Sequence, residues 1–265
     1  MADHIDVTRA FDAGAGRYDV LVASNPGYHA SLAAAARQLA NRLRGLGAGP
    51  DVIDLGCGTG ASTKALVQAL GPGIGTITGI DASQGMLDRA VSKTWPAGVR
   101  FRQGRAQDLP ALTGATQEVD GVFMAYLLRN VPDSERDSLL RSVFDQLRPG
   151  GWCVLHEYSV AGRPAAIAIW GIVCWLVVIP LGTLTGGGFG LYRYLWRSVL
   201  DFDTLDTVTW RLHQARFVEV QIYPTRGGPA GCCTPSSPGG LDESAVAARP
   251  GSRRPPPARQ PGSLE

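Results

Sequence analysis

Between residues 28 and 159, segments with the apolar pattern of strands alternate with segments that have the apolar spacing of helices. Short runs rich in β-branched and aromatic residues, typical of strands, occur five times. They are Val52–Leu55, Thr76–Asp81, Val99–Gly104, Val119–Ala125 and Trp152–Ser159. Segments with helical spacing separate these runs, and an Ala-rich amphipathic segment at Tyr28–Leu46 precedes them. Because strands that alternate with helices indicate βαβ units, the sequence predicts an α/β fold with a Rossmann-like, doubly wound, mostly parallel sheet.

The pattern changes from Arg163 onward. Residues 164–192 include no charged side chain, and a helical segment (204–217) and a strand (217–224) follow. From residue 227 the chain is rich in Gly, Pro, Ser and Arg, a composition typical of disorder. We therefore divide the chain into an N-terminal helical cap, a ligand-binding core, an apolar segment with the last helix and strand, and a disordered tail. The boundaries are 1–47, 48–160, 161–226 and 227–265.

Composition narrows the class of protein. The net charge of +2 gives no basic footprint for a nucleic-acid partner. The first residues contain acids and no apolar core, unlike a secretory signal. The five cysteines have no C-x-x-C spacing and no nearby histidine pair, which indicates neither a metal site nor a disulfide framework. A reducing cytoplasm fits this pattern best.

The stretch DVIDLGCGTGAST (Asp51–Thr63) places three alternating glycines directly after the first strand. A Walker phosphate loop would need a lysine next to the last glycine, and Lys64 lies four residues after Gly60. The dinucleotide fingerprint G-x-G-x-x-G also differs from the G-x-G-x-G found here. S-adenosylmethionine carries no phosphate; it needs a close backbone and a carboxylate for its ribose. Asp81 provides that carboxylate about twenty residues onward, whereas an ordinary turn would explain only the glycines.

Three segments, VIDLGCGTG, GIDASQGMLDRA and LRPGGW, together resemble class I S-adenosylmethionine-dependent methyltransferases. Within these, FDAGAGRYDVL, LLRNVPD and the region from YRYLWRSVL to VEVQIY resemble the quinone-ring C-methyltransferases of ubiquinone and menaquinone biosynthesis, the UbiE/MenG group. The resemblance implies the class I methyltransferase fold, whose sheet normally ends with an antiparallel hairpin. Here we expect the final strand to be missing, since GGPAGCCTPSSPGGL has no strand pattern. We hypothesise that the chain from about residue 228 is a shifted reading frame.

The resemblance also implies cofactor contacts at Thr59, at Asp81 for the ribose, and at Arg105 and Ala106 for the adenine. Asp54 is expected to order the loop amides or to accept a hydrogen bond from the cofactor's ammonium group. The expected cofactor-binding residues are Asp54, Gly56, Cys57, Gly58, Thr59, Gly60, Asp81, Ala82, Met86, Arg105, Ala106, Gln107 and Ala125.

Two positions depart from the family pattern. Arg105 stands where the family usually has Asn or Asp, and a guanidinium group has donors only. Gln107, Asp108 or the Ala106 backbone would then read the adenine. Ala125 stands where the quinone enzymes often have a serine.

The implied reaction is methyl transfer to a carbon of a prenylated quinone ring, and the candidate catalytic residues are Tyr18, Tyr126, Asn130, His156 and Glu157. A general base or a polarising hydrogen bond would assist, which favours His156 or Glu157 at the exit of their strand. The two tyrosine rings are candidates to face the sulfonium, and Asn130 to orient the acceptor. Each also has a purely structural interpretation, and Arg129 is interpreted as a helix cap or a surface charge.

The apolar segment offers about sixteen residues before Pro180, near the lower limit for crossing a bilayer. It is a buried lid, an insertion into one leaflet, or a span; we favour a lid or an insertion. The implied partners are an apolar small molecule and a membrane surface, at the cytoplasmic face of the cell membrane. Alternatives are a methyltransferase for another apolar molecule, such as a lipid or polyketide, and an inactive membrane-associated adenosylmethionine-binding protein.

Overall fold

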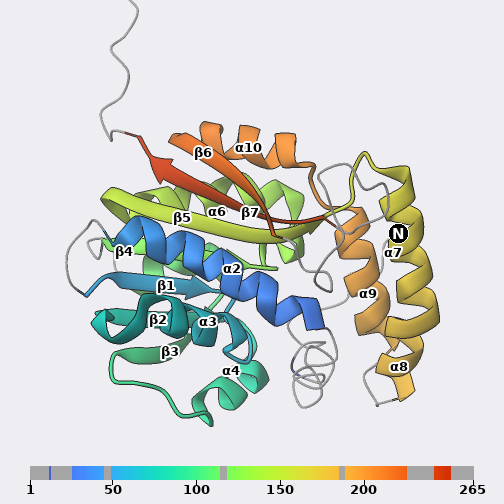
Figure 1. Ribbon diagram of the computed structural model, residues 1–265, viewed down its shortest axis with the longest axis horizontal. Helices are drawn as coiled ribbons and strands as arrows, with labels where there is room; N and C mark the ends of the chain where they lie inside the picture. The colour runs from blue at the N-terminus through green and yellow to red at the C-terminus, as the bar shows by residue number, and fades with distance from the viewer. Residues whose placement is uncertain are drawn as a thin grey trace, which may run out of the picture.

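The computed structural model describes residues 12, 26–44, 49–113, 118–184, 189–225 and 242–251. In these ranges the chain forms one seven-stranded sheet with helices on both faces (Figure 1). The strands are β1 (Asp51–Leu55), β2 (Thr76–Asp81), β3 (Val99–Gln103), β4 (Val119–Ala125), β5 (Leu147–Ser159), β6 (Phe217–Thr225) and β7 (Asp242–Pro250). The α-helices are α2 (Pro26–Leu43), α3 (Ala61–Leu70), α4 (Gln84–Val91), α5 (Leu109–Thr113), α6 (Asp133–Gln146), α7 (Pro164–Val173), α8 (Ile179–Leu184), α9 (Phe189–Leu200) and α10 (Leu205–Gln214). Short 3-10 turns lie at Gly71–Gly73, Ala106–Asp108 and Leu128–Asn130.

The strand order is β3-β2-β1-β4-β5-β7-β6. Strands β1 to β5 pair in parallel, and β7 runs antiparallel to both β5 and β6. The order reverses between β1 and β4, and open α/β sheets bind ligands outside the carboxyl ends of their strands at such a switch point. The predicted doubly wound, mostly parallel sheet is confirmed, and each of the six strands expected from the sequence is present.

Two apolar clusters hold the helices to the sheet. On one face, Leu32 and Leu39 of α2 are buried with Phe123 of β4. On the other face, Leu140 of α6 and Leu212 of α10 are buried against the sheet. Because both faces are covered, the central strands are apolar almost throughout, and β4 is buried at all seven positions.

The expectation of a missing final strand is wrong. Strand β7 lies between β5 and β6 and pairs with both along its length. Its centre consists of small residues, and Ala245, Ala247 and Ala248 are fully buried. Alanine is depleted in strands, so this segment has no local strand signal; two paired edges and two covered faces override that weak preference. The predicted disorder and the reading-frame hypothesis otherwise concern residues 226–241 and 252–265, which lie outside the described residues.

The apolar segment forms a continuous helical rod from Pro164 to Leu184. The helix continues through Pro180 because a π-turn at Cys174–Val178 precedes it, with the Ile179 N–H donating to the Cys174 carbonyl. The rod stands beside α9 at one end of the sheet (Figure 1). Its buried side includes Ala166 and Cys174, whereas several large apolar side chains on the rod are exposed, among them Ile172, Trp175, Leu176, Val177 and Leu181. By length and composition alone, this is one helix among the described residues that could cross a membrane.

Candidate functional site

The glycine loop after β1 is a tight turn in which backbone amides replace side chains. Gly56, Gly58 and Gly60 have φ of 78°, 53° and 89°, which L-residues with a Cβ rarely adopt. A Cβ on Gly56 would also lie 2.9 Å from a side-chain carbon of Leu127. The amides of Gly56 and Cys57 donate to the Ile80 carbonyl at 2.7 and 3.1 Å. The loop therefore lies against the end of β2, and α3 begins directly after it.

Asp81 joins the end of β2 to this loop. Its Oδ2 accepts from the Gly58 amide at 2.8 Å, and its Oδ1 accepts from the Ser83 amide at 2.9 Å. Burial raises the pKa of Asp81, and the hydrogen bonds from the Ser83 and Gly58 amides oppose that shift. Each carboxylate oxygen keeps a further lone pair for a ligand hydroxyl. The residue faces the cavity described below, as the ribose assignment requires.

Asp54 lies behind the loop and is fully buried. Its Oδ2 accepts from the Ser62 hydroxyl at 2.8 Å and from the Thr63 hydroxyl at 2.5 Å. Burial raises the pKa of Asp54 to about 6. Neither Asp54 nor Gly60 lines the cavity, so the structure places both as supports of the turn.

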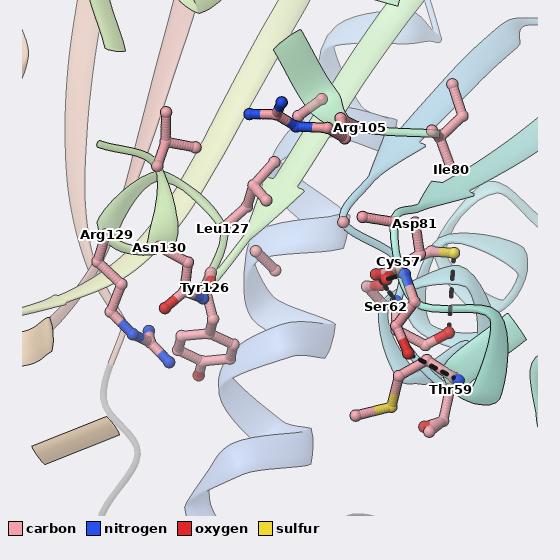
Figure 2. Close-up of a pocket in the computed structure, with 18 of the residues that line it drawn as sticks. Cys57, Thr59, Ser62, Ile80, Asp81, Arg105, Tyr126, Leu127, Arg129 and Asn130 are labelled. Atoms are coloured by element: carbon pink, nitrogen blue, oxygen red, sulfur yellow. Dashed lines mark hydrogen bonds between the residues drawn. The ribbon is translucent and has the colours of Figure 1, made fainter. Parts of the chain in front are cut away.

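A cavity of about 510 Å³ lies at the carboxyl ends of β1, β2 and β4, within the size range of small-molecule sites. Eleven of the thirteen expected cofactor residues line it: Gly56, Cys57, Gly58, Thr59, Asp81, Ala82, Met86, Arg105, Ala106, Gln107 and Ala125. Figure 2 shows the loop residues and Asp81 on one side, facing Tyr126, Arg129 and Asn130 on the other. The fold therefore brings the glycine loop, Asp81 at the end of β2 and the turn after β4 to one cavity.

Arg105, Ala106 and Gln107, which are expected at the adenine, differ in their surroundings. The Arg105 side chain is 60% exposed, and its guanidinium lies 3.5 Å from Glu135 of α6. The Gln107 amide nitrogen donates to the same carboxylate at 2.7 Å. Arg105 is thus directed to a surface carboxylate, while Ala106 beside it is buried in the cavity wall. All three residues line the cavity, and their roles toward the adenine stay predictions.

Tyr126 forms much of the opposite wall. It has φ of 56°, and among the described residues only Arg216 is another non-glycine residue with positive φ. Its ring stacks between those of Tyr28 and Tyr158, with centroid separations of 5.1 and 4.9 Å. The Asn130 amide donates to the Tyr126 carbonyl at 2.9 Å. Strained backbone held by its surroundings clusters at functional sites, and this residue fits that pattern.

The two base candidates on β5 do not line the cavity. His156 is fully buried, with its Nε2 3.0 Å from the Tyr126 hydroxyl. Glu157 is buried beside Arg129, whose guanidinium donates to it at 3.0 Å. This geometry therefore places neither side chain in direct contact with the cavity. Tyr18 lies outside the described residues.

Arg129 and Tyr28 are among the lining residues that sequence reasoning missed. The interpretation of Arg129 as a cap or surface charge is wrong, because its side chain is only 8% exposed, lines the cavity and is paired with Glu157. The sequence did contain a signal for this pair. Arg129 follows the end of β4 and Glu157 lies near the end of the neighbouring strand β5, and the two side chains have opposite charges. Tyr28 lines the cavity from α2, where its helical spacing gave no indication of a ligand site.

The cavity lining suits the positioning of an organic ligand. Among the described residues, no group of three His, Cys, Asp or Glu side chains could hold a metal ion. The cavity instead combines backbone amides, one carboxylate and stacked aromatic rings, which are groups that recognise a nucleoside and a flat acceptor.

Comparison with known proteins identifies the class of enzyme. Residues 52–151 match the model of a methyltransferase domain. A demethylmenaquinone methyltransferase of Lactococcus lactis is 33% identical over 185 residues, which are 69% of this chain and 71% of that protein.

Solved structures agree on the fold. A phosphoethanolamine N-methyltransferase of Haemonchus contortus in complex with S-adenosyl-L-methionine superposes with a TM-score of 0.63 at 15% identity, over 94% of this chain and 61% of that one. A chain of the complex between the Haloferax volcanii Trm112 methyltransferase activator and a methyltransferase gives 0.61 at 17% identity, over 94% and 100%. The chain therefore belongs to the class I S-adenosylmethionine-dependent methyltransferases, in the family of the demethylmenaquinone methyltransferases, and S-adenosylmethionine is its cofactor.

Proposed function

We propose that this methyltransferase methylates a ring carbon of a prenylated quinol of the demethylmenaquinol type. The observation that carries the proposal is the aromatic wall that Tyr28 and Tyr126 form in the cavity; the two rings stack on each other, and Tyr158 stacks on Tyr126 from outside the cavity lining. A flat, apolar ring fits against such a wall, and the relative from Lactococcus lactis reported above is a demethylmenaquinone methyltransferase by name. Both points support a quinone acceptor over a polar one.

The proposed roles of the site residues follow from their positions. The amides of the glycine loop and the Thr59 region hold the methionine part of the cofactor, and Asp81 accepts from the ribose hydroxyls. Ala106 and Gln107, which line the same cavity, contact the adenine in this proposal. When bound, the cofactor supplies an electrophilic methyl group, so the protein mainly positions two reactants and excludes water.

Arg129 and Glu157 form an ion pair, so the two charges offset each other. The guanidinium lies 5.1 Å from the centroid of the Tyr126 ring and 5.7 Å from that of Tyr158. Because Glu157 neutralises it, Arg129 donates hydrogen bonds at the cavity wall without placing a net charge beside an apolar acceptor. Asn130 is held by Tyr194 of α9, whose hydroxyl donates to it at 3.2 Å, which ties the cavity wall to the helices of the apolar segment.

We further propose that the rod from Pro164 to Leu184 contacts one leaflet of the cell membrane from the cytoplasmic side. Its inner side is engaged in the protein, since Trp170 stacks on Tyr158 at 6.0 Å and donates from its indole nitrogen to the Trp196 carbonyl at 3.2 Å. A helix that crossed the bilayer would have to leave these contacts. An apolar outer side next to the site suits an acceptor whose prenyl tail resides in lipid.

Radiolabel transfer tests the acceptor. Purified protein is incubated with methyl-labelled S-adenosylmethionine and chemically reduced demethylmenaquinone in detergent micelles. We expect label in the quinone, on a ring carbon, and none in phospholipid added to the same micelles. Label in the phospholipid, or no transfer to the quinol, would contradict the proposed acceptor.

The ribose assignment has its own test. Asp81→Ala removes the acceptor of charge-assisted hydrogen bonds, each worth about 1.5–3 kcal/mol, so we expect affinity for S-adenosylmethionine to fall at least about thirtyfold by calorimetry. Asp88→Ala is the control, because Asp88 is an exposed carboxylate on α4 outside the cavity. Equal affinities of the two variants would remove Asp81 from the site.

A further inference from the structure

Asn130 ends the short turn that follows β4, in the cavity wall that faces the glycine loop (Figure 2). Its backbone is fixed, since the Asn130 backbone amide donates to the Leu127 carbonyl at 2.8 Å. Its side-chain amide has partners on two different elements, the backbone carbonyl of Tyr126 and the hydroxyl of Tyr194 in α9. The candidate residue for orienting the acceptor is therefore held from both ends of its amide.

These two contacts determine the orientation of the amide. A backbone carbonyl can only accept, so the atom 2.9 Å from the Tyr126 carbonyl oxygen is Nδ2 of Asn130. The other end of the amide, Oδ1, then faces Tyr194. Because this oxygen can also only accept, the Tyr194 hydroxyl donates its proton to it, at 3.2 Å. The direction of both hydrogen bonds thus follows from the positions of the atoms and from the donors and acceptors that each group has.

The amide keeps hydrogen-bonding capacity for a ligand. It has two N–H donors and an oxygen with two lone pairs. Within the described part of the chain, one N–H is engaged with Tyr126 and one lone pair with Tyr194, so one of each remains at the cavity that Asn130 lines. A quinol hydroxyl both donates and accepts, and it can therefore bond to either remaining position. Because the amide is anchored at both ends, that position is fixed before a ligand binds.

Tyr194 reaches the amide from a helix that is packed into the fold. Val199 of α9 is buried in one cluster with Val160, which follows β5, and with Ala166 of the rod. Tyr194 itself does not line the cavity. Its hydroxyl can therefore act on a ligand only through Asn130.

We propose that Tyr194 is a positioning residue, which fixes the Asn130 amide in the orientation that bonds to a ring hydroxyl of the methyl acceptor. This rests on the proposed quinol acceptor. Methyl transfer needs the reacting ring carbon in line with the methyl group, and a ring held at its hydroxyl has fewer orientations to sample. Without the Tyr194 hydroxyl, Asn130 keeps only its contact with the Tyr126 carbonyl, and less of the bound acceptor is in the reactive orientation. The loss appears in turnover of the quinol and not in binding of the cofactor, since neither hydrogen bond of the amide involves the glycine loop or Asp81.

Kinetics of variants test this role in the demethylmenaquinol assay. Tyr194→Phe retains the ring and removes only the hydroxyl, so we expect kcat/KM for the quinol to fall about three- to tenfold, the effect of one hydrogen bond, with an unchanged KM for S-adenosylmethionine. Asn130→Ala is expected to lower kcat/KM for the quinol at least as much. Adding Tyr194→Phe to Asn130→Ala is expected to have no further effect, because both changes break the same hydrogen bond.

Tyr192→Phe is the matched control, because it removes a hydroxyl from the same helix outside the cavity lining and should leave both kinetic constants unchanged. Three results would each overturn the positioning role while leaving the quinol acceptor intact. They are a Tyr194→Phe enzyme as efficient as the unaltered one, a Tyr192→Phe enzyme as slow as Tyr194→Phe, and additive losses in the double variant.

The side-chain amide of Asn130 allows a measurement that needs no acceptor. In nitrogen-labelled protein, the Nδ2 signals of Asn130 are expected to shift when Tyr194 is replaced by Phe and to stay in place when Tyr192 is replaced. Signals that stay in place in both variants would also overturn the positioning role. An unaltered enzyme that transfers no methyl group to the quinol would instead overturn the proposed function, whatever the Asn130 signals show.

Discussion

At the scale of single residues, the glycine loop depends on two different physical requirements that can be separated. Gly60 combines φ of 89° with a neighbour, since an added Cβ would lie 2.8 Å from a ring carbon of Trp95. Gly58 of the same loop has φ of 53° but nothing within 4 Å. Gly58→Ala should therefore cost only the backbone term, about 1 kcal/mol, whereas Gly60→Ala should cost about 2–4 kcal/mol in urea unfolding.

The steric part of that difference is assigned by a second substitution. Trp95→Leu opens space beside Gly60, so adding Gly60→Ala in that background should cost little more than Gly58→Ala does. An undiminished cost in the Trp95→Leu background would show that backbone strain alone accounts for the cost of Gly60→Ala.

How far single residues could be predicted from sequence depended on whether their role was local. The loop glycines and Asp81 were identified because their roles follow from strand ends and spacing, and these are visible along the chain. Arg129 was misjudged because its partner, Glu157, lies on β5, far from it along the chain. Burial decided this case, and burial depends on packing that one-dimensional patterns do not contain.

At the scale of elements, β7 carries more of the fold than its composition suggests. It is hydrogen-bonded to β5 on one edge and to β6 on the other, so its removal would leave two strand edges unpaired. A chain that ends at Thr225 is expected to lose more than about 5 kcal/mol of unfolding free energy and to associate through those edges. A chain that ends at Gly251 keeps β7 and serves as the control, with an unfolding transition like that of the full chain. Cooperative unfolding of both chains at the same temperature would contradict this role for β7.

The elements also show where the hydrophobic pattern of the sequence predicts a strand and where it does not. Runs such as that of β4 are apolar at nearly every position because helices cover both faces of the sheet, and these were predicted correctly. The centre of strand β7 (244–248) is also buried but is built mainly from alanine and serine, whose apolar signal is weak. Its place between β5 and β6 comes from long-range pairing, which no window of neighbouring residues contains.

At the scale of the whole molecule, the exposed side of the helical rod is the surface that we propose contacts the membrane. Leu176 is 73% exposed and Val177 is 53% exposed, so each can lose contact with water on meeting a bilayer. Replacing both with Glu should remove about 3 kcal/mol or more of insertion energy, and thus lower binding to phospholipid vesicles at least about hundredfold in flotation. Val91→Glu is the control, because Val91 is 62% exposed on α4, on a different element from the rod. Transfer to an acceptor in detergent micelles should be retained by both variants, since neither change touches the cavity lining. Equal flotation of the rod variant and the Val91 variant would mean that this surface does not contact the membrane.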